Sequence, residues 1–497
     1  MTIFTSQPSS FETASGLLRM GNDRSPHPEE RAKRVSRRAR AGAIAAMCLL
    51  LPACTNTPYE VAADEGEIQP IRAVTTSSVV HPDWSRDAVI YQINTRQYSE
   101  TGTFAAVEAD LDRIRALGVD ILWFMPIHPI GEARRKGELG SPYAVRDFRK
   151  VNPELGTEAD FRSLVDAVHA RDMKIIIDWV PNHSAWDNWM ITEHPGWYTR
   201  DANGEMQHPP DTDWYDVADL NYDDPALRDY MRESLAYWVE QFDIDGYRCD
   251  VAGMVPTDFW ESVRPRLDAV KPVFMLAEWQ QPDLHENAFD ASYAWRWKEI
   301  MQGIAAGERP VADLGAYYND YQNNWPDNAM RMAYTDNHDQ NTWDGLTQEI
   351  YGDAYEAAVV LSFTGEGIPL IYNGQECDNR NRLEFFERDP IEWNCEADIG
   401  DLFRDLVALK TANPALHNAP WGGRLVEVED GSDAVFSFTR EADGNRVLVM
   451  MNLSGTDQTL EATPAAGRYA DWRSGETVEL GGALTLPAWG YRVLLQR

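Results

Sequence analysis

Eight side chains that can do acid–base or ionic chemistry follow four short apolar segments of the sequence. Five are carboxylates, one is an arginine and two are histidines: Asp178, His183, Arg248, Asp250, Glu278, Asp336, His338 and Asp339. A single aspartate after a strand is usually a helix cap, but capping does not explain four such clusters in order along one chain. We therefore expect the four segment ends to meet at one reaction site.

Two of the carboxylates, Asp250 and Glu278, suit the cleavage of a glycosidic bond with retention of configuration. That reaction needs a carboxylate that attacks the anomeric carbon and a carboxylic acid that protonates the leaving oxygen, about 5–5.5 Å apart. Arg248 stands two residues before Asp250, on the same face of a strand, and its charge is expected to keep Asp250 ionised. Glu278 must instead hold a proton near neutral pH, which nearby negative charge promotes.

The other polar residues of these clusters suit the recognition of a sugar. Asp339 can accept hydrogen bonds from sugar hydroxyls as positive charge develops on the ring, and His183 and His338 also suit hydroxyl groups. The chain contains 18 Trp, and aromatic rings stack on the apolar faces of sugars, although most Trp in any protein serve packing.

Short apolar segments alternate with amphipathic helical segments between Asp87 and about Asn413, which is typical of parallel strands covered by helices. The expected strands are Ala88–Ile93, Gly118–Phe124, Met173–Val180, Ile244–Cys249, Val273–Ala277, Met330–Tyr334 and Ile368–Tyr372. We predict an α/β fold, a (β/α)8 TIM barrel with insertions, because the length fits it better than an open doubly wound sheet. The absence of a glycine-rich dinucleotide-binding motif after the first strand also argues against the open doubly wound sheet.

Two helices have clear start signals. Thr157 and Asp160 form an expected capping box at the start of one helix, and Asp224 is an expected N-cap before Pro225 in another.

Four parts are expected along the chain: a signal segment at residues 1–54, a disordered tether at 55–84, the catalytic barrel at 85–418 and a C-terminal antiparallel β-sandwich domain at 419–497. Turn signals predict a small domain inserted in the barrel at residues 184–223, after the third strand. In the C-terminal part, two β-rich segments are joined at Asp443-Gly444, which predicts a hairpin.

The composition is strongly acidic. The chain carries 80 acidic and 45 basic residues, for a formal net charge of −35. A surface this negative repels nucleic acid and anionic lipid and favours neutral partners such as sugars. The same charge also fits any soluble acidic protein, so it excludes a nucleic-acid partner without selecting an activity.

The first 54 residues have the layout of an export signal. A basic cluster from Arg31 to Arg40 precedes an uncharged, largely apolar segment, 41–53, that is too short for a permanent membrane helix. The segment ends in Leu-Pro-Ala before Cys54, which resembles the lipobox of bacterial lipoproteins, although the proline is unusual there. We expect export and a lipid anchor at Cys54, with the protein in the periplasm or on the outer membrane. An ordinary cleaved signal is the alternative.

The strand-end clusters resemble the short signature regions of the α-amylase family of glycoside hydrolases, family 13. The matching segments are Asp178–His183, Gly246–Asp250, Glu278 and Asn337–Asp339, with flanking matches at Gly118–Pro126, Ser141–Tyr143, Asp147, Gly367–Pro369, Tyr372 and Gly374–Glu376. The resemblance covers roughly residues 87–497, and it implies a catalytic barrel, a small inserted domain and a C-terminal β-sandwich.

The resemblance also implies roles for individual residues. Asp250 is the expected nucleophile, Glu278 the acid/base and Asp339 the stabiliser of the transition state. The expected substrate-binding residues are Tyr143, His183, Arg248, Trp279 and His338, with Tyr143 stacked on the sugar at the cleavage subsite. The implied activity is retaining hydrolysis of α-1,4-glucosidic bonds in maltooligosaccharides and other α-glucans.

No cofactor is expected to take part in the chemistry. In calcium-binding relatives the counterparts of Asn182 and Asp219 are ligands, so a structural Ca²⁺ at these residues is an open expectation. Two oxygen donors are too few to define a calcium cage.

The sequence departs from relatives that cut long starch chains at three positions near the nucleophile. Gly253 and Met254 replace the usual Lys-His pair, and the branched Val251 directly follows Asp250. These residues favour short maltooligosaccharides over insoluble starch. An α-1,6-acting glucosidase, a cyclomaltodextrinase-like or neopullulanase-like enzyme and a transglycosylase stay open as alternatives. A non-catalytic sugar-binding barrel is disfavoured because all three catalytic carboxylates are present.

The five cysteines are expected to have different fates after export. Cys48 is removed with the signal, Cys54 is acylated, and Cys249 is an inert buried thiol beside the nucleophile. Cys377 and Cys395 remain, and in an oxidising compartment we predict that they form a disulfide that pins the long loop after the last strand.

Overall fold

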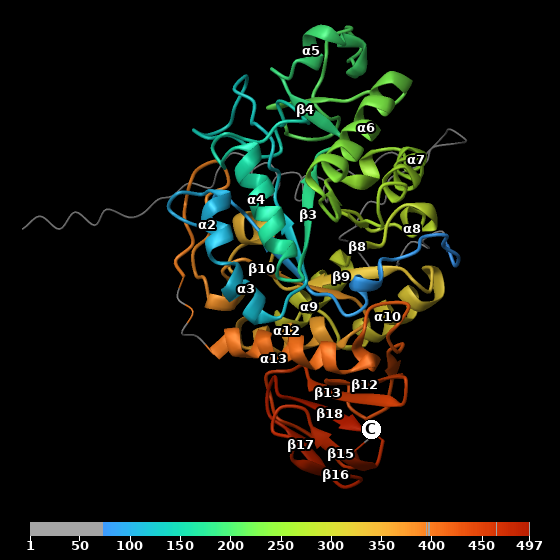
Figure 1. Cartoon of the computed structure of the whole chain (residues 1–497). Helices are drawn as coiled ribbons and strands as arrows, with labels where there is room; N and C mark the ends of the chain where they lie inside the picture. The colour runs from blue at the N-terminus through green and yellow to red at the C-terminus, as the bar shows by residue number, and fades with distance from the viewer. Residues whose placement is uncertain (1–72, 394, 396–397, 464, 497) are drawn as a thin grey trace, which may run out of the picture. The chain divides into compact units, whose positions relative to one another are not determined.

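The computed structural model describes residues 73–393, 395, 398–463 and 465–496, whose course is shown in Figure 1. The expected signal segment, Cys54 and the first part of the expected tether lie outside these residues. Within the described ranges, every helix is too short or too polar to cross a bilayer.

Eight parallel strands close into a barrel in the order β1-β10-β9-β8-β7-β6-β3-β2, which confirms the predicted TIM barrel (Figure 1). The strands are β1 (Ile90–Ile93), β2 (Ile121–Phe124), β3 (Lys174–Trp179), β6 (Gly246–Cys249), β7 (Phe274–Ala277), β8 (Ala291–Tyr293), β9 (Met330–Tyr334) and β10 (Ile368–Tyr372). Seven of them coincide with the segments expected from the sequence. Strand β8 was not predicted from the sequence, because its three residues include the polar Ser292 and form no apolar segment.

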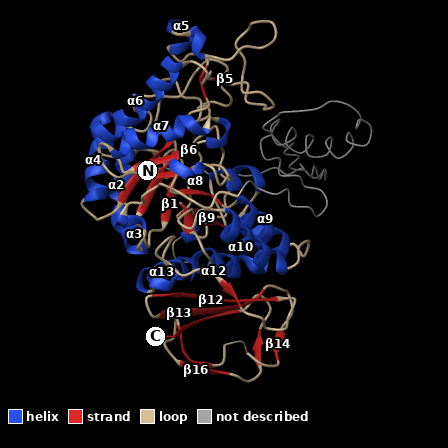
Figure 2. Ribbon diagram, turned by 90° about the vertical axis from the view of Figure 1, so that its right-hand side faces the viewer, coloured by secondary structure: helices blue, strands red, loops and turns tan. Residues whose placement is uncertain are grey.

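Helices cover the outside of the barrel (Figure 2). The longer ones are α2 (Phe104–Ala109), α3 (Leu111–Leu117), α4 (Glu158–His169), α6 (Pro225–Phe242), α7 (Thr257–Asp268), α9 (Trp295–Ala305), α10 (Ala312–Asn324), α12 (Tyr355–Thr364) and α13 (Asp398–Ala412). Short helices are α5 (Met190–Glu193), α8 (Leu284–Asn287) and α11 (Thr347–Tyr351).

Both predicted helix starts are confirmed. At α4, the Thr157 side chain accepts from the Asp160 N–H at 3.2 Å, and the Asp160 carboxylate accepts from the Thr157 N–H at 2.8 Å. At α6, Asp224 accepts from the N–H groups of Ala226 and Leu227. A capping group of this kind stabilises a helix by about 1 kcal/mol.

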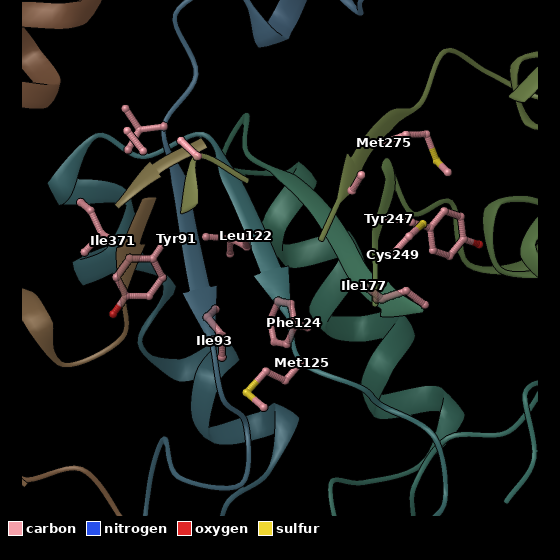
Figure 3. Packing of buried hydrophobic residues seen from close by; sticks show 14 of the residues in the cluster. Tyr91, Ile93, Leu122, Phe124, Met125, Ile177, Tyr247, Cys249, Met275 and Ile371 are labelled. Carbon is pink, nitrogen blue, oxygen red and sulfur yellow. The ribbon is translucent and has the colours of Figure 1, made fainter. Parts of the chain in front are cut away.

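Alternate strand residues face two hydrophobic layers, because successive side chains of a strand point to opposite faces. The layer inside the barrel includes Ile90, Ile121, Trp123, Ile176, Phe274 and Leu276. The layer between strands and helices, part of which is seen in Figure 3, includes Tyr91, Ile93, Leu122, Phe124, Ile177, Tyr247 and Met275. Each fully buried apolar side chain contributes about 1.5–3 kcal/mol, so the two layers hold the strand ends in place.

The chain between β3 and α6 forms the small inserted region expected there. Strand β4 (His183–Ala185) pairs with β5 (Val217–Asp219) in antiparallel register, which places His183 opposite Asp219. This pairing joins the two ends of the insertion beside the carboxyl end of β3.

The C-terminal part is built from antiparallel sheets, as predicted. A six-stranded sheet has the order β11-β12-β13-β18-β15-β16, and β14 pairs with β17. The strands are β11 (Val426–Glu427), β12 (Val435–Ala442), β13 (Asn445–Asn452), β14 (Gln458–Leu460), β15 (Gly467–Asp471), β16 (Thr477–Leu480), β17 (Leu484–Leu486) and β18 (Tyr491–Gln496). Asp443 and Gly444 have φ values of 50° and 76°, as the predicted two-residue hairpin turn requires.

Buried polar contacts join this sheet to the barrel. The Arg440 side chain of β12 donates to the carbonyls of Gly365, His417 and Gly423. Tyr318 of α10 stacks on Phe436 of β12 with ring centroids 6.2 Å apart.

Residues 73–84 correct the predicted tether. The Val74 N–H donates to Asn324 O at 2.9 Å, and the buried His81 ring lies between Asp290 Oδ1 at 2.6 Å and Asn328 O at 2.7 Å. The prediction of disorder is therefore wrong for these residues, because long-range hydrogen bonds that composition does not reveal fix them on the barrel.

Candidate active site

The carboxyl ends of β3, β6 and β7 bring three carboxylates around one guanidinium. Strand register places Asp178 opposite Arg248, and both side chains are fully buried. Arg248 Nη1 lies 2.8 Å from Asp178 Oδ1 and 3.0 Å from Asp250 Oδ1, while Nη2 lies 2.8 Å from Glu278 Oε1. Asp178 and Glu278 raise the pKa of Arg248 well above its usual value, against the effect of burial, so its charge is permanent.

Burial raises the pKa of all three carboxylates against the opposing charge of Arg248. The pKa is about 7 for Asp178 and for Asp250, and about 8 for Glu278. Arg248 lowers the pKa of Asp250, in the expected direction, but burial acts against it and one guanidinium is shared among three carboxylates. Burial and the neighbouring charge of Asp250 raise the pKa of Glu278, as the role of a general acid requires.

The backbone turn after the nucleophile is strained and points at Glu278. Val251 has φ 36° and ψ 47°, a left-handed conformation that a β-branched residue rarely adopts. In this conformation the Val251 N–H donates to Glu278 Oε2 at 2.8 Å. Strain of about 1–3 kcal/mol at such a residue persists only where the surrounding structure imposes it.

A hydrogen-bonded chain links Gln92, His338, Tyr143 and Asp178. The side-chain oxygen of Gln92, Oε1, accepts from the His338 backbone N–H at 3.3 Å. The other end of that side chain, the Nε2 amide group, therefore donates to His338 Nδ1 at 2.7 Å. The His338 proton then sits on Nε2 and faces Tyr143 Oη at 2.8 Å, and Tyr143 donates to Asp178 Oδ2 at 3.0 Å. The chain fixes the tautomer of His338 and the direction of the Tyr143 hydroxyl.

The remaining expected residues lie around this centre in different ways. The Asp339 side chain is 44% exposed, 3.6 Å from His338 Nε2, and its charge raises the pKa of Glu278. His183 is buried, and burial lowers its pKa to about 3, so it is neutral. The Trp279 indole covers the backbone at Gly253, where any added Cβ would collide with its ring.

Asp336 is the one carboxylate of the sequence clusters that has a structural partner instead. Its Oδ1 accepts from the Asn337 N–H at 3.0 Å. Asp336 therefore holds the turn after β9.

Sequence reasoning missed two residues of the centre. Gln92 stands among apolar neighbours in β1 and is fully buried, and a polar residue at an inward position of a barrel strand is the signal that could have revealed it. Val251 was noted for its size, whereas its strained conformation can be seen only in the structure.

Asn182 and Asp219, the two residues expected to bind calcium, provide few oxygen ligands. Asp219 Oδ2 accepts from the Thr199 hydroxyl at 2.6 Å, and the Asn182 amide lies 3.4 Å from His183 Nδ1. Among the described residues, no three His, Cys, Asp or Glu side chains gather as a metal site would require. Two oxygens do not fit a cation that takes six to eight ligands. Calcium at this place stays a prediction, and a rise in melting temperature on adding CaCl₂ after EDTA treatment would test it.

The cysteine predictions are confirmed for the described residues. Cys377 and Cys395 form a disulfide with a Cα–Cα distance of 4.0 Å. Cys249 is a buried free thiol, and burial raises its pKa well above the usual value, which makes it inert.

Known proteins similar to this chain share the same catalytic domain. The family profile described as "Alpha amylase, catalytic domain" matches residues 92–217 and 211–422. An α-amylase of Haloarcula japonica is 29% identical over 414 residues, which cover 80% of this chain and 59% of the relative. A cyclomaltodextrin glucanotransferase of Bacillus licheniformis is 25% identical over 71% of this chain and 54% of the relative. The chain thus spans little more than half the length of these two relatives.

Two solved structures match almost their whole length. An α-amylase from Lactobacillus plantarum is 34% identical with a TM-score of 0.75, and the match covers 83% of this chain and 100% of that one. A maltogenic α-amylase from Thermotoga neapolitana is 28% identical with a TM-score of 0.74, over 82% of this chain and 98% of that one. The chain belongs to the α-amylase family of glycoside hydrolases, family 13.

Proposed function

We propose that the protein is a retaining α-glucoside hydrolase that cleaves α-1,4 bonds in maltooligosaccharides. The observation that carries the proposal is the contact of one buried Arg248 with both Asp250 and Glu278, at 3.0 Å and 2.8 Å. A single side chain thus holds two carboxylates beside each other, as a two-carboxylate mechanism requires.

In the proposed reaction, Asp250 attacks the anomeric carbon while Glu278 transfers its proton to the glycosidic oxygen, so that the bond to the leaving sugar breaks. Water then attacks the glycosyl ester, gives a proton to Glu278 and releases Asp250 with the configuration retained. The Val251 N–H lies 2.8 Å from Glu278 Oε2 and Arg248 Nη2 lies 2.8 Å from Oε1, and these two contacts fix the orientation of the acid.

Sugar binding is proposed for the residues around these two carboxylates. Tyr143 presents its ring to the sugar at the cleavage subsite, and His338, whose Nε2 lies 2.8 Å from Tyr143 Oη, contacts a hydroxyl group of the same sugar. Asp339, half exposed at the mouth, is placed to accept hydroxyl groups and to face the developing positive charge. His183 and Trp279 complete the proposed set, with Trp279 near the leaving sugar.

The relatives support α-glucan chemistry and leave two outcomes for the glycosyl intermediate. The maltogenic α-amylase at 28% identity supports hydrolysis of short α-1,4-glucans. The cyclomaltodextrin glucanotransferase at 25% identity supports transfer to a second sugar as the alternative. Both outcomes use the same intermediate, because water and a sugar hydroxyl compete for it.

The proposal is tested by product analysis on maltoheptaose, pullulan, isomaltose and a cyclodextrin. We expect cleavage of maltoheptaose to glucose and maltose, with the α-anomer formed first. Products of inverted configuration would contradict the two-carboxylate mechanism. Activity on another α-glucoside without any on α-1,4-glucans would contradict the substrate while leaving the mechanism in place.

The pH dependence of kcat/KM provides a second test. Asp250 must be ionised and Glu278 protonated, so the two limbs of the profile are expected to report the pKa values of the coupled pair, both of which burial raises above the usual carboxyl range. The charge of Asp339 raises both pKa values, so Asp339→Asn is expected to shift both limbs to lower pH. Limbs that stay in place in this variant would show that Asp339 does not act on the pair.

We also propose that the exported protein is anchored by a lipid on Cys54. The support is the basic cluster, the short apolar segment and the lipobox-like Leu-Pro-Ala-Cys sequence. Mass spectrometry of the N-terminal peptide is expected to show a lipid-modified Cys54 as the first residue. An unmodified N-terminus at another position would indicate an ordinary cleaved signal.

A further inference from the structure

The hydrogen bonds that link Gln92 to Asp178 run in one direction, from donor to acceptor, because neither end can reverse. At the β1 end, Gln92 Oε1 faces the His338 backbone N–H, which can only donate, so the Gln92 amide group faces His338 Nδ1 as a donor. At the other end, Asp178 Oδ1 accepts from Arg248 Nη1 at 2.8 Å, and a guanidinium can only donate. Between these ends, His338 donates to Tyr143 and Tyr143 donates to Asp178.

The two middle residues, His338 and Tyr143, are able to bond in the opposite direction. A neutral histidine can carry its proton on either ring nitrogen, and a tyrosine hydroxyl can turn toward another acceptor. With the proton on Nδ1, His338 would point an N–H at the Gln92 amide group, 2.7 Å away, and Tyr143 would donate to His338 Nε2 instead of Asp178. Two donors that face each other repel, so the Gln92 amide group excludes this arrangement.

Burial makes the direction important, because water cannot replace a misdirected bond. Gln92 and Asp178 are fully buried, and His338 is 2% exposed. The His338 ring also packs edge-on against Trp123, with centroids 6.0 Å apart, and nearly parallel to the Tyr143 ring, at 5.7 Å. His338 therefore responds to a changed partner by moving its proton, since its neighbours hold the ring in place.

The direction of the bonds acts on the charge of Asp178. Burial raises the pKa of Asp178 to about 7, whereas Arg248 and the hydrogen bond from Tyr143 lower it. Burial and the charge of Asp178 raise the pKa of Tyr143 well above its usual value, so the phenol keeps the proton that it donates. Without that donor, Asp178 would be protonated more readily, and its ion pair with Arg248 would weaken.

We propose that Gln92 is a positioning residue that sets the direction of these hydrogen bonds and so keeps Tyr143 donating to a charged Asp178. The inference rests on the proposed function, in which Tyr143 faces the sugar and Arg248 holds the two reacting carboxylates. Both polar atoms of the buried Gln92 side chain contact His338, so Gln92 acts through that histidine and does not touch the substrate.

The variant Gln92→Glu tests the proposal, because a carboxylate of the same shape offers no N–H to His338 Nδ1. We expect the His338 proton on Nε2 in the wild type and on Nδ1 in Gln92→Glu. Nitrogen-15 NMR of protein labelled in its histidine rings distinguishes the two positions, and the His338 signals are those missing from His338→Gln. For 4-nitrophenyl α-maltoside, kcat/KM is expected to fall about tenfold in Gln92→Glu, the effect of one lost hydrogen bond.

Gln375→Glu is the matched control. Gln375 is also buried, its Oε1 accepts from the Tyr372 N–H, and its amide group donates to the hydroxyl groups of Thr335 and Tyr355. Hydroxyl groups can turn to donate to a carboxylate, so no neighbour has to move a ring proton. The His338 proton is expected to stay on Nε2 in this variant, and kcat/KM is expected to change less than twofold.

A proton on Nδ1 in the wild type would overturn the proposal, and this measurement needs no variant to fold. A proton that stays on Nε2 in Gln92→Glu would also overturn it, as would a proton that moves while the active enzyme keeps its kcat/KM. The NMR result does not depend on turnover, which separates it from the proposed function. If the wild type cleaves no α-glucoside but the proton moves in Gln92→Glu, the function is wrong and the control of direction by Gln92 stands.

Discussion

The two ends of the barrel use buried aspartates in opposite ways. At the base, where the strands begin, Asp120, Asp245 and Asp290 stand directly before β2, β6 and β8. Each accepts from a backbone N–H of the neighbouring strand: Val89 N at 3.1 Å, Ile175 N at 2.9 Å and Met275 N at 2.8 Å, respectively. These bonds tie adjacent strands together where the barrel has no catalytic task.

Cations are distributed differently at the two ends. At the base, Asp290 has Arg264 at 2.8 Å and the His81 ring at 2.6 Å, and Asp245 has Lys271 at 3.1 Å and the His169 ring at 2.7 Å. Asp120 is the exception, because it forms no ion pair within the described part of the chain and burial raises its pKa to about 7. At the mouth, where the strands end, three carboxylates share the single Arg248. A buried carboxylate that has a cation of its own is stabilised in its charged form. Buried carboxylates that share one cation have raised pKa values, so they exchange protons near neutral pH. Asp245 and Asp290 at the base therefore serve stability, whereas the carboxylates at the mouth serve chemistry.

The largest expected effect on activity comes from substitutions of the carboxylates at the mouth. Asp250→Asn and Glu278→Gln are each expected to lower kcat by several orders of magnitude, because each removes a group that takes part in bond breaking. The melting temperature should be unchanged or raised, since a buried carboxyl group with a raised pKa is replaced by a neutral amide. Steady-state kinetics and calorimetry measure both quantities. Asp250→Asn with more than a tenth of wild-type activity would refute its assignment as nucleophile.

The next largest expected effect is a loss of stability from a substitution at the base of the barrel. Asp290→Asn is expected to destabilise the fold by about 3 kcal/mol, because it removes the fully buried counter-charge of Arg264 and leaves only the more exposed Asp268, at 2.7 Å. The kcat of the remaining folded enzyme should be unchanged. Asp327→Asn is the matched control, since this exposed carboxylate pairs with Arg424 at the surface and should contribute little. Chemical denaturation measures the loss, and equal effects of the two variants would contradict the division between base and mouth.

The disulfide cross-links the loop that follows β10, so its contribution to the stability of the mouth can be measured by removing it. Cys377→Ser with Cys395→Ser is expected to cost about 3 kcal/mol, since the cross-link restricts the unfolded chain. The Gln97 amide also donates to Glu384 O, and Asn341 Oδ1 accepts from the Leu383 N–H, so hydrogen bonds hold the chain between Cys377 and Cys395 as well. Activity on short substrates should therefore survive. A loss of activity without a loss of stability would show that the cross-link, and not these side chains, positions the loop.

The sequence was sufficient for features that local patterns encode. Apolar segments followed by charged residues predicted seven barrel strands and the clusters at their ends, and capping and hairpin signals predicted Thr157, Asp224 and Asp443. It was insufficient where partners lie far apart in the chain. The Asp389 N–H, in the loop that the disulfide closes, donates to the Gln97 side-chain carbonyl across 292 residues, and neither residue belongs to a periodic pattern.

The balance of charge at the mouth was also beyond sequence reasoning. Arg248 and Asp250 are two residues apart and predicted an ionised nucleophile, but the outcome depends on Asp178 and Glu278, which come from other strands. How many carboxylates share one cation, and how deeply they are buried, are properties of the folded barrel alone.

The smallest expected effect is on the pH dependence of stability, which should have opposite signs at the two ends. Burial raises the pKa of Glu278 from its usual value near 4.5 to about 8, so its contribution to stability is present below pH 4.5 and is lost as pH rises toward 8. The pKa of Asp245 is lowered by His169 and Lys271 despite its burial, so its contribution is present above the unfolded pKa and is lost as pH falls.

Between pH 5 and pH 7, the free energy of unfolding of Glu278→Gln should therefore rise relative to wild type, by at most about 1.4 kcal/mol per pH unit for one proton. Asp245→Asn should instead be destabilised at pH 5 and pH 7 alike, and should approach wild type only in acid, where the wild-type carboxylate is itself protonated. Denaturant titrations of the three proteins at pH 3, 5 and 7 measure these differences. If the two variants changed with pH in the same direction over the whole range, mouth and base would not differ in how they hold their protons.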